Sequence, residues 1–239
     1  MDWLVKLTGD NYILDELSKS LITPESSIIK DNQEYFLKSI EFKKALDEGA
    51  VTKSANEILL RINGGCMLFL GGGMPIQINN VVRVNDDGTR SNYATFNVGT
   101  RFVVRAPILV LKSDGTVLEI RVADLVQSAL KAAESKESIA KVLCLLGSNT
   151  YDWRILRNVY EIIKDDVLGP EQIKKNGWTT QEAIERFLGT VNDPRVLDKE
   201  ALHGVPQRGK TNKKPITNPM SFNEAKSFVE GIIHAWLGF

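Results

Sequence analysis

The chain carries apolar residues first in a strand-type pattern and later at helical spacing. The order of these two patterns constrains the fold more than any other feature. Short apolar runs and alternating segments beside turn residues occur before about residue 122 of the 239-residue chain. Segments after that point repeat their apolar residues at the spacing of an amphipathic helix. Strands followed by helices, rather than alternating with them, indicate an α+β protein. We therefore predict a strand-rich domain over residues 1–122 and an all-helical bundle over residues 123–239, with the boundary between 120 and 150.

The first domain is predicted to combine antiparallel strands with a packed helix. Residues 3–7 and 34–42 have strand character, whereas residues 12–21 have helical spacing. A further helix is predicted over residues 51–62, because five apolar residues share one helical face: Val51, Ala55, Ile58, Leu59 and Ile62. Gly64 and Gly65 are expected to end this helix, and the following CMLFL (66–70) to form a buried strand.

Two β-hairpins are predicted next. Four apolar residues are expected to share one face of the strand over 76–84: Ile76, Ile78, Val82 and Val84. The NDDG at 85–88 is typical of a tight hairpin turn, because Asp-Gly accepts the positive φ that such turns require. Residues 108–122 repeat the pattern around Ser-Asp-Gly at 113–115 and predict a second hairpin.

Capping residues mark helix starts in the second domain. Thr179 with Glu182, and Ser221 with Glu224, match the capping-box pattern in which a Ser or Thr is followed three residues later by Glu. The segment 151–169 carries another apolar stripe, and 123–147 is predicted as one long helix or two short ones.

Composition excludes several classes of function. Thirty Lys and Arg balance 30 Asp and Glu, so a general attraction to nucleic acid or to an anionic membrane is not predicted. Cys66 and Cys144 lie in apolar runs and are expected to be buried free thiols. The N-terminus lacks a signal-peptide pattern, and no window approaches the roughly 18 apolar residues of a membrane span. We expect a cytoplasmic protein without membrane contact.

Cofactor and metal motifs are not matched. The glycines at 64, 65 and 71–73 are not followed by Gly-Lys-Ser/Thr and do not have dinucleotide-loop spacing. The cysteines and the two histidines, His203 and His234, have no metal-ligand spacing between them. We therefore expect no cofactor and no metal.

His203 is the candidate catalytic residue. In RVLDKEALHG (195–204), Arg195 precedes it by a little over two helical turns, so both side chains share a face if the segment is helical. A guanidinium could bind a phosphodiester while the imidazole moves a proton. Four basic residues follow as candidate phosphate contacts: Arg208, Lys210, Lys213 and Lys214. The alternative is that His-Gly simply ends a helix before a solvated basic loop.

The C-terminal part of the chain resembles the HEPN superfamily, and especially the C-terminal domains of abortive-infection proteins. The residues that carry this resemblance are RVLDKEALHG (195–204) and SFNEAKSFVEGIIHAWL (221–237), within about 90 residues that begin at YDWRILRNVY. The resemblance implies a helical bundle that dimerises and places two motifs across a shared cleft. It also implies a role in prokaryotic conflict systems such as phage defence.

Three functions remain open from the sequence. The favoured one is a non-catalytic regulatory protein that binds a protein partner, a second copy of itself or RNA through its helical half. The second is a metal-independent ribonuclease that uses His203 and Arg195. The third is a small-molecule-sensing regulator with a pocket between the sheet and the helix at 52–63.

Overall fold

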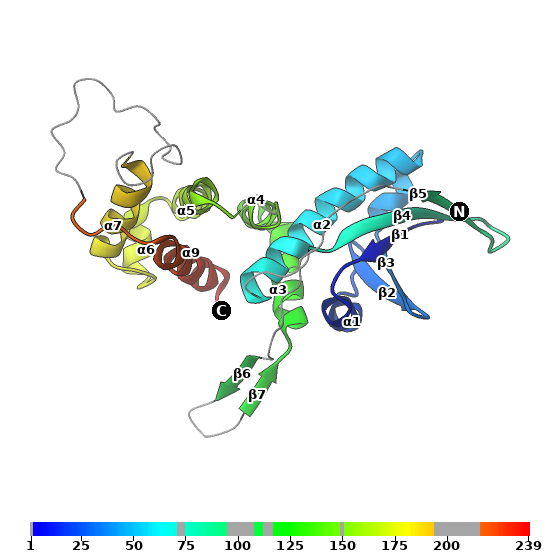
Figure 1. Ribbon diagram of the computed structural model, residues 1–239, viewed down its shortest axis with the longest axis horizontal. Coiled ribbons are helices and arrows are strands. Elements are labelled where there is room, and N and C mark those ends of the chain that lie inside the picture. The colour runs from blue at the N-terminus through cyan, green and yellow to red at the C-terminus, as the bar shows by residue number, and fades with distance from the viewer. Residues whose placement is uncertain (1, 71–74, 95–107, 112–116, 149–150, 194–215) are drawn as a thin grey trace. The chain divides into compact units, whose positions relative to one another are not determined.

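The computed structural model describes residues 2–70, 75–94, 108–111, 117–148, 151–193 and 216–239. The chain forms two compact units, Met1–Asn149 and Thr150–Phe239. The elements of each are labelled in Figure 1.

The first unit contains an antiparallel sheet and helices, so the predicted α+β class is confirmed. Five strands form the sheet in the order β2-β3-β1-β4-β5, and β6 pairs with β7 in a separate two-stranded ribbon. The strands are β1 (Asp2–Thr8), β2 (Ser27–Asp31), β3 (Glu34–Lys38), β4 (Gln77–Val84), β5 (Arg90–Ala94), β6 (Ile108–Leu111) and β7 (Val117–Ile120). The helices are α1 (Asn11–Ser20), the 3-10 helix η1 (Ile40–Lys44), α2 (Glu48–Leu70), α3 (Val122–Ser135) and α4 (Glu137–Leu146).

The five-stranded sheet buries the central row of one face. Val5 on β1 pairs with Leu37 on β3 and with Val81 on β4, and none of these three side chains is exposed to solvent. Cross-strand partners share a face, so this row is the centre of the core beneath α1 and α2. The strand pairs of both predicted hairpins are present, with Gly88 at φ +81° in the first turn. The turn predicted at 113–115 lies outside the described residues.

The opposite face of the sheet carries a smaller apolar cluster. Leu4, Phe36 and Val82 are buried there, and the Arg90 guanidinium lies 5.6 Å from the centre of the Phe36 ring. Arg90 also donates to Asp31 at 2.8 Å. Since Arg90 and Asp31 belong to the two edge strands, the sheet must be strongly curled on this face.

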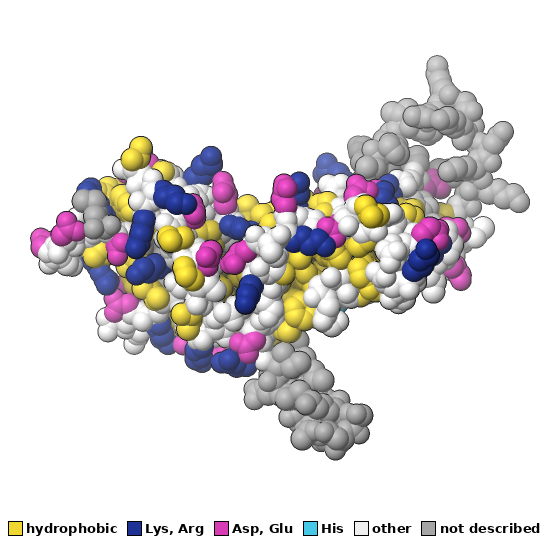
Figure 2. Space-filling model, turned by 180° about the vertical axis from the view of Figure 1, so that it is seen from behind, with side chains coloured by type: hydrophobic (Ala, Val, Ile, Leu, Met, Phe, Trp, Pro, Cys, Tyr) yellow, Lys and Arg dark blue, Asp and Glu magenta, His cyan; other side chains and the backbone are white. Residues whose placement is uncertain are grey.

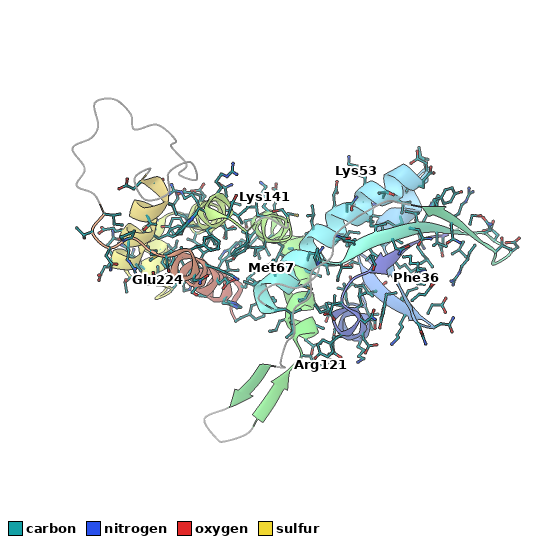
Figure 3. The ribbon with its side chains drawn as sticks, in the orientation of Figure 1. Phe36, Lys53, Met67, Arg121, Lys141 and Glu224 are labelled. Carbon is teal, nitrogen blue, oxygen red and sulfur yellow. The ribbon has the colours of Figure 1, made fainter. Side chains whose placement is uncertain are left out.

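The prediction that Gly64 and Gly65 end a helix is wrong, as is the strand predicted for CMLFL. Helix α2 continues through both glycines to Leu70, and Figure 3 shows Met67 on its C-terminal part. A Cβ on Gly64 would lie 1.9 Å from the Leu143 carbonyl oxygen, and one on Gly65 would lie 3.0 Å from Val126 Cγ1. The glycines are therefore needed for the close approach of α2 to α4 and α3, and not for a turn.

The predicted face of β4 is also only partly right. Lys6 pairs with Asn80 but Leu7 pairs with Ile78, so Asn79 is an extra residue in β4. A bulge of this kind reverses the alternation along the strand. Ile78 consequently shares the core face with Val81, whereas Val82 belongs to the opposite face.

The boundary between the compact units, at 149/150, lies within the predicted range of 120–150 but later than 122/123. Helices α3 and α4 pack against α2, and α3 also packs against α1, so both belong with the sheet. The second unit consists of α5 (Trp153–Asp166), α6 (Pro170–Lys175), α7 (Gln181–Asn192) and α9 (Phe222–Leu237).

An aromatic cluster forms the core of the second unit. The Tyr160 ring lies 5.5 Å from Phe187 and 6.3 Å from Phe228, between centroids, and thereby joins α5, α7 and α9. Arg186 connects α7 to the start of α9 by donating to the Asn218 carbonyl at 2.9 Å and to the Glu224 carboxylate at 2.8 Å.

Two capping predictions have different outcomes. The capping box of Ser221 and Glu224 is confirmed, and Figure 3 shows Glu224 at the start of α9. The box predicted for Thr179 and Glu182 is wrong by one residue, because Thr180 is the N-cap and accepts from the backbone N–H of Ala183. Thr179 and Thr180 both carry a hydroxyl that can cap a helix, and the backbone conformation determines which of them is the N-cap.

In the described part of the chain, no helix combines the length and the apolar character that are needed to cross a membrane. Figure 2 shows Lys and Arg side chains intermingled with Asp and Glu over the face in view.

Candidate ligand-binding site

A cavity of about 320 Å³ lies in the first unit, between α2 and the chain that enters β4. Its walls come from three places in the sequence. Asn56, Leu59, Leu60 and Asn63 line it from α2, residues 75–78 line it from the sheet, and Gly147 closes it beyond the end of α4. Its volume is at the lower end of the range of roughly 300–1,000 Å³ that is usual for small-molecule sites.

Helix α2 forms its wall with a second side-chain stripe. Positions 56, 59, 60 and 63 follow the spacing of one helical face. The core stripe is different: Val51, Ala55 and Ile62 have no exposed surface. One helix thus packs on the sheet with one set of residues and lines the cavity with another.

The side-chain amide of Asn63 fixes the opposite wall. Its Nδ2 donates to the Ile76 carbonyl at 2.9 Å, and its Oδ1 accepts from the Ile76 backbone N–H at 2.8 Å. Asn63 therefore satisfies both backbone groups of the residue that leads into β4. Because a buried hydrogen-bonding group left without its partner costs roughly 1–3 kcal/mol, this clamp holds the wall in place before any ligand arrives.

Close helix packing fixes the third wall. A Cβ on Gly147 would lie 2.0 Å from the Leu60 carbonyl oxygen, so the end of α4 touches the backbone of α2 beside the cavity. The Gly147 N–H itself donates to the Leu143 carbonyl at 2.9 Å and ends α4. Contacts between backbones cannot be relieved by side-chain rotation, so this part of the site is rigid.

The electrostatic character of the cavity is neutral. Asp, Glu, Lys, Arg and His do not occur among the described residues that line it, and its polar side chains are the carboxamides of Asn56, Asn63 and Gln77. These residues therefore offer no counter-charge to an ionised ligand.

A second cavity, of about 40 Å³, lies between α1, α2 and α3 and is lined in part by Ile13, Cys66 and Val126. A single water molecule needs roughly 10–15 Å³ of such space. The enclosed part of this cavity has room for a few waters.

Burial shifts the pKa of two titratable side chains that the sequence singles out, Cys144 and His234. Burial raises the pKa of Cys144, so its thiol is protonated at neutral pH and is a poor nucleophile. Burial lowers the pKa of His234, although Glu230 acts in the opposite direction. Groups of three or more His, Cys, Asp or Glu that could hold a metal ion do not occur among the described residues.

All six site residues predicted from the sequence lie outside the described residues. They are His203, Arg195, Arg208, Lys210, Lys213 and Lys214, within 194–215. The sequence also did not identify Asn56, Asn63 and Gln77 as site residues. The spacing of 56, 59, 60 and 63 was the available signal, but it is masked by the stronger apolar stripe on the same helix.

Comparison with known proteins gives no relative. No family model, curated protein or solved structure matches the chain.

Proposed function

We propose that the protein is a non-catalytic regulator whose α+β unit binds a small uncharged molecule and whose helical unit binds a macromolecular partner. The α2–β4 cavity is the observation that carries this proposal. Its walls are held by the Asn63 clamp and by backbone contact at Gly147, so little ordering is required when a ligand binds.

The proposal is tested by filling the cavity. Leu60→Trp places a large side chain on the lining stripe, and Lys53→Trp, on the same helix at a residue that does not line the cavity, is the control. Both variants and the wild type are screened by thermal shift against a library of small neutral compounds. A ligand at a hundred times its Kd adds about 2.7 kcal/mol, which is a rise of roughly 5–10 °C in Tm for a unit of this size.

We expect compounds that raise the Tm of the wild type and of Lys53→Trp but not that of Leu60→Trp. Stabilisation that persists in Leu60→Trp would place the ligand elsewhere and overturn the proposal. A screen in which no compound stabilises the wild type would also overturn it.

Metal-independent RNA cleavage by His203 and Arg195 is a second candidate function. It is supported by the all-helical character of the described residues after 150, which the HEPN resemblance implies. The test is incubation with single-stranded RNA in EDTA. Loss of cleavage in His203→Ala but not in His234→Ala, the only other histidine, would support this candidate, and intact RNA with the wild type would exclude it.

RNA binding without cleavage would instead support the partner-binding role of the helical unit. Retention that falls steeply as salt is raised would indicate phosphate contacts, for which Arg208, Lys210, Lys213 and Lys214 are the candidates. Retention unaffected by salt would argue against these contacts.

A further inference from the structure

The two uncommitted carboxamides in the α2–β4 cavity indicate which chemical class of ligand it takes. Asn63 uses its amide to hold Ile76. The side chains of Asn56 and Gln77 make no hydrogen bond to any residue that the structure describes, although both line the cavity. They approach it from different elements, one on α2 and the other on β4.

A carboxamide offers a donor and an acceptor side by side. It pairs best with a ligand edge that also presents an acceptor and a donor next to each other, as Asn and Gln do with the edge of adenine. Two such groups on different walls favour a ligand with polar atoms around its rim over one with a single polar end.

The remaining walls are apolar. Leu59, Leu60, Pro75 and Ile76 supply hydrocarbon surface between the two amides. Such surface suits the faces of a ring, whereas the exposed Asn56 and the half-buried Gln77 can hydrogen-bond its polar edge. The described lining residues include no charged side chain, which disfavours an anion or a cation.

The volume of the cavity limits the size of the ligand. The volume of about 320 Å³ is at the lower end of the range of roughly 300–1,000 Å³ for small-molecule sites. That space accommodates a compound of one or two rings.

We infer that the α2–β4 cavity binds a neutral, flat heterocycle of nucleobase size, with Asn56 and Gln77 hydrogen-bonding its edge. This inference rests on the proposed function and specifies the ligand of the same site.

The test compares three kinds of probe by titration calorimetry with the full chain. Uracil and adenine represent neutral heterocycles, orotate is a charged ring of similar size, and indole is a largely apolar one. Asn56→Leu and Gln77→Met remove the amides while keeping side-chain size. Glu57→Gln, an exposed neighbour on α2 that does not line the cavity, is the control. Far-UV circular dichroism checks that each variant is folded.

We expect uracil or adenine to bind more tightly than orotate and indole. Asn56→Leu or Gln77→Met should weaken that binding about tenfold, the usual effect of losing a hydrogen bond worth roughly 1.4 kcal/mol. Glu57→Gln should leave it unchanged.

Preferential binding of indole or orotate would overturn the ligand class and leave the proposed function standing. Heterocycle binding that survives both amide substitutions would overturn the role of the carboxamides. If none of the probes binds but the compound library yields a ligand whose stabilisation Leu60→Trp abolishes, only the ligand class fails. If neither yields a ligand, the proposed function fails with it.

Discussion

Gly64→Ala is a substitution for which helix propensity and packing predict opposite results. Alanine in a helix interior is favoured over glycine by about 1 kcal/mol. At Gly64, however, the new Cβ would lie 1.9 Å from the Leu143 carbonyl oxygen, 2.6 Å from its carbonyl carbon and 2.9 Å from its Cα. These are backbone atoms, so α2 and α4 would have to separate by about 1 Å to accommodate the methyl group.

Overpacking of a close-packed core costs roughly 1–3 kcal/mol, and a clash with backbone belongs at the upper end of this range. After subtraction of the propensity gain, we expect Gly64→Ala to lower the unfolding free energy by about 2 kcal/mol. For a unit of this size the corresponding drop in Tm is roughly 4–8 °C.

Two matched glycines serve as controls. Gly231 lies in α9 with nothing within 4 Å of an added Cβ, so Gly231→Ala should stabilise the second unit by about 1 kcal/mol. Gly65→Ala meets only the Val126 side chain, at 3.0 Å, and should fall between the two. Urea denaturation followed by circular dichroism, with hydrogen exchange to assign each transition to a unit, measures the series. A Gly64→Ala protein as stable as the wild type would refute the close approach of α2 and α4.

Three further predictions concern the second unit. The Ser221 backbone N–H and Arg186 lower the pKa of Glu224 to about 2, so its stabilising contribution is complete above the unfolded pKa near 4.5 and is lost as the pH falls towards 2. Glu224→Gln should flatten that part of the stability–pH curve, and an unchanged curve would contradict the assignment. Leu168 is 95% exposed and has φ +64°, so Leu168→Gly should raise the unfolding free energy by about 1 kcal/mol in urea titrations, whereas a loss would argue against the left-handed conformation. The buried Tyr160 hydroxyl has no hydrogen-bond partner among the described residues, so Tyr160→Phe should keep the stability or raise it by about 1 kcal/mol, and a marked loss would reveal an acceptor.

Local pattern predicted most of the described elements. Alternation of apolar residues predicts the N-terminal strand, turn residues predict the hairpins, and the three-residue spacing of Ser221 and Glu224 predicts the capping box. These features depend on neighbours in the sequence, so they can be read without knowledge of the tertiary structure.

The wrong secondary-structure predictions arise where contacts with residues distant in the sequence determine the local structure. Gly64-Gly65 before an apolar run is typical of a helix end followed by a strand, but the backbone of Leu143 requires glycine there for another reason. The bulge at Asn79 is likewise visible only in the register between β4 and β1. Local alternation cannot reveal either contact.

A pocket between the sheet and the helix at 52–63 belongs to the third functional hypothesis from the sequence, and the α2–β4 cavity lies between these elements. That a ligand binds there stays a prediction. The roles of Asn63 and Gln77 depend on how residues 75–78 approach α2, which no spacing in the sequence specifies.

The most direct test of the central claim, that the α2–β4 cavity is a ligand site, is a backbone amide NMR titration of the full chain with the tightest-binding neutral heterocycle. We predict saturable shift changes concentrated at residues 56–63, 75–78 and 147. Changes concentrated in the second unit, or the absence of saturable changes at the cavity residues, would contradict the account.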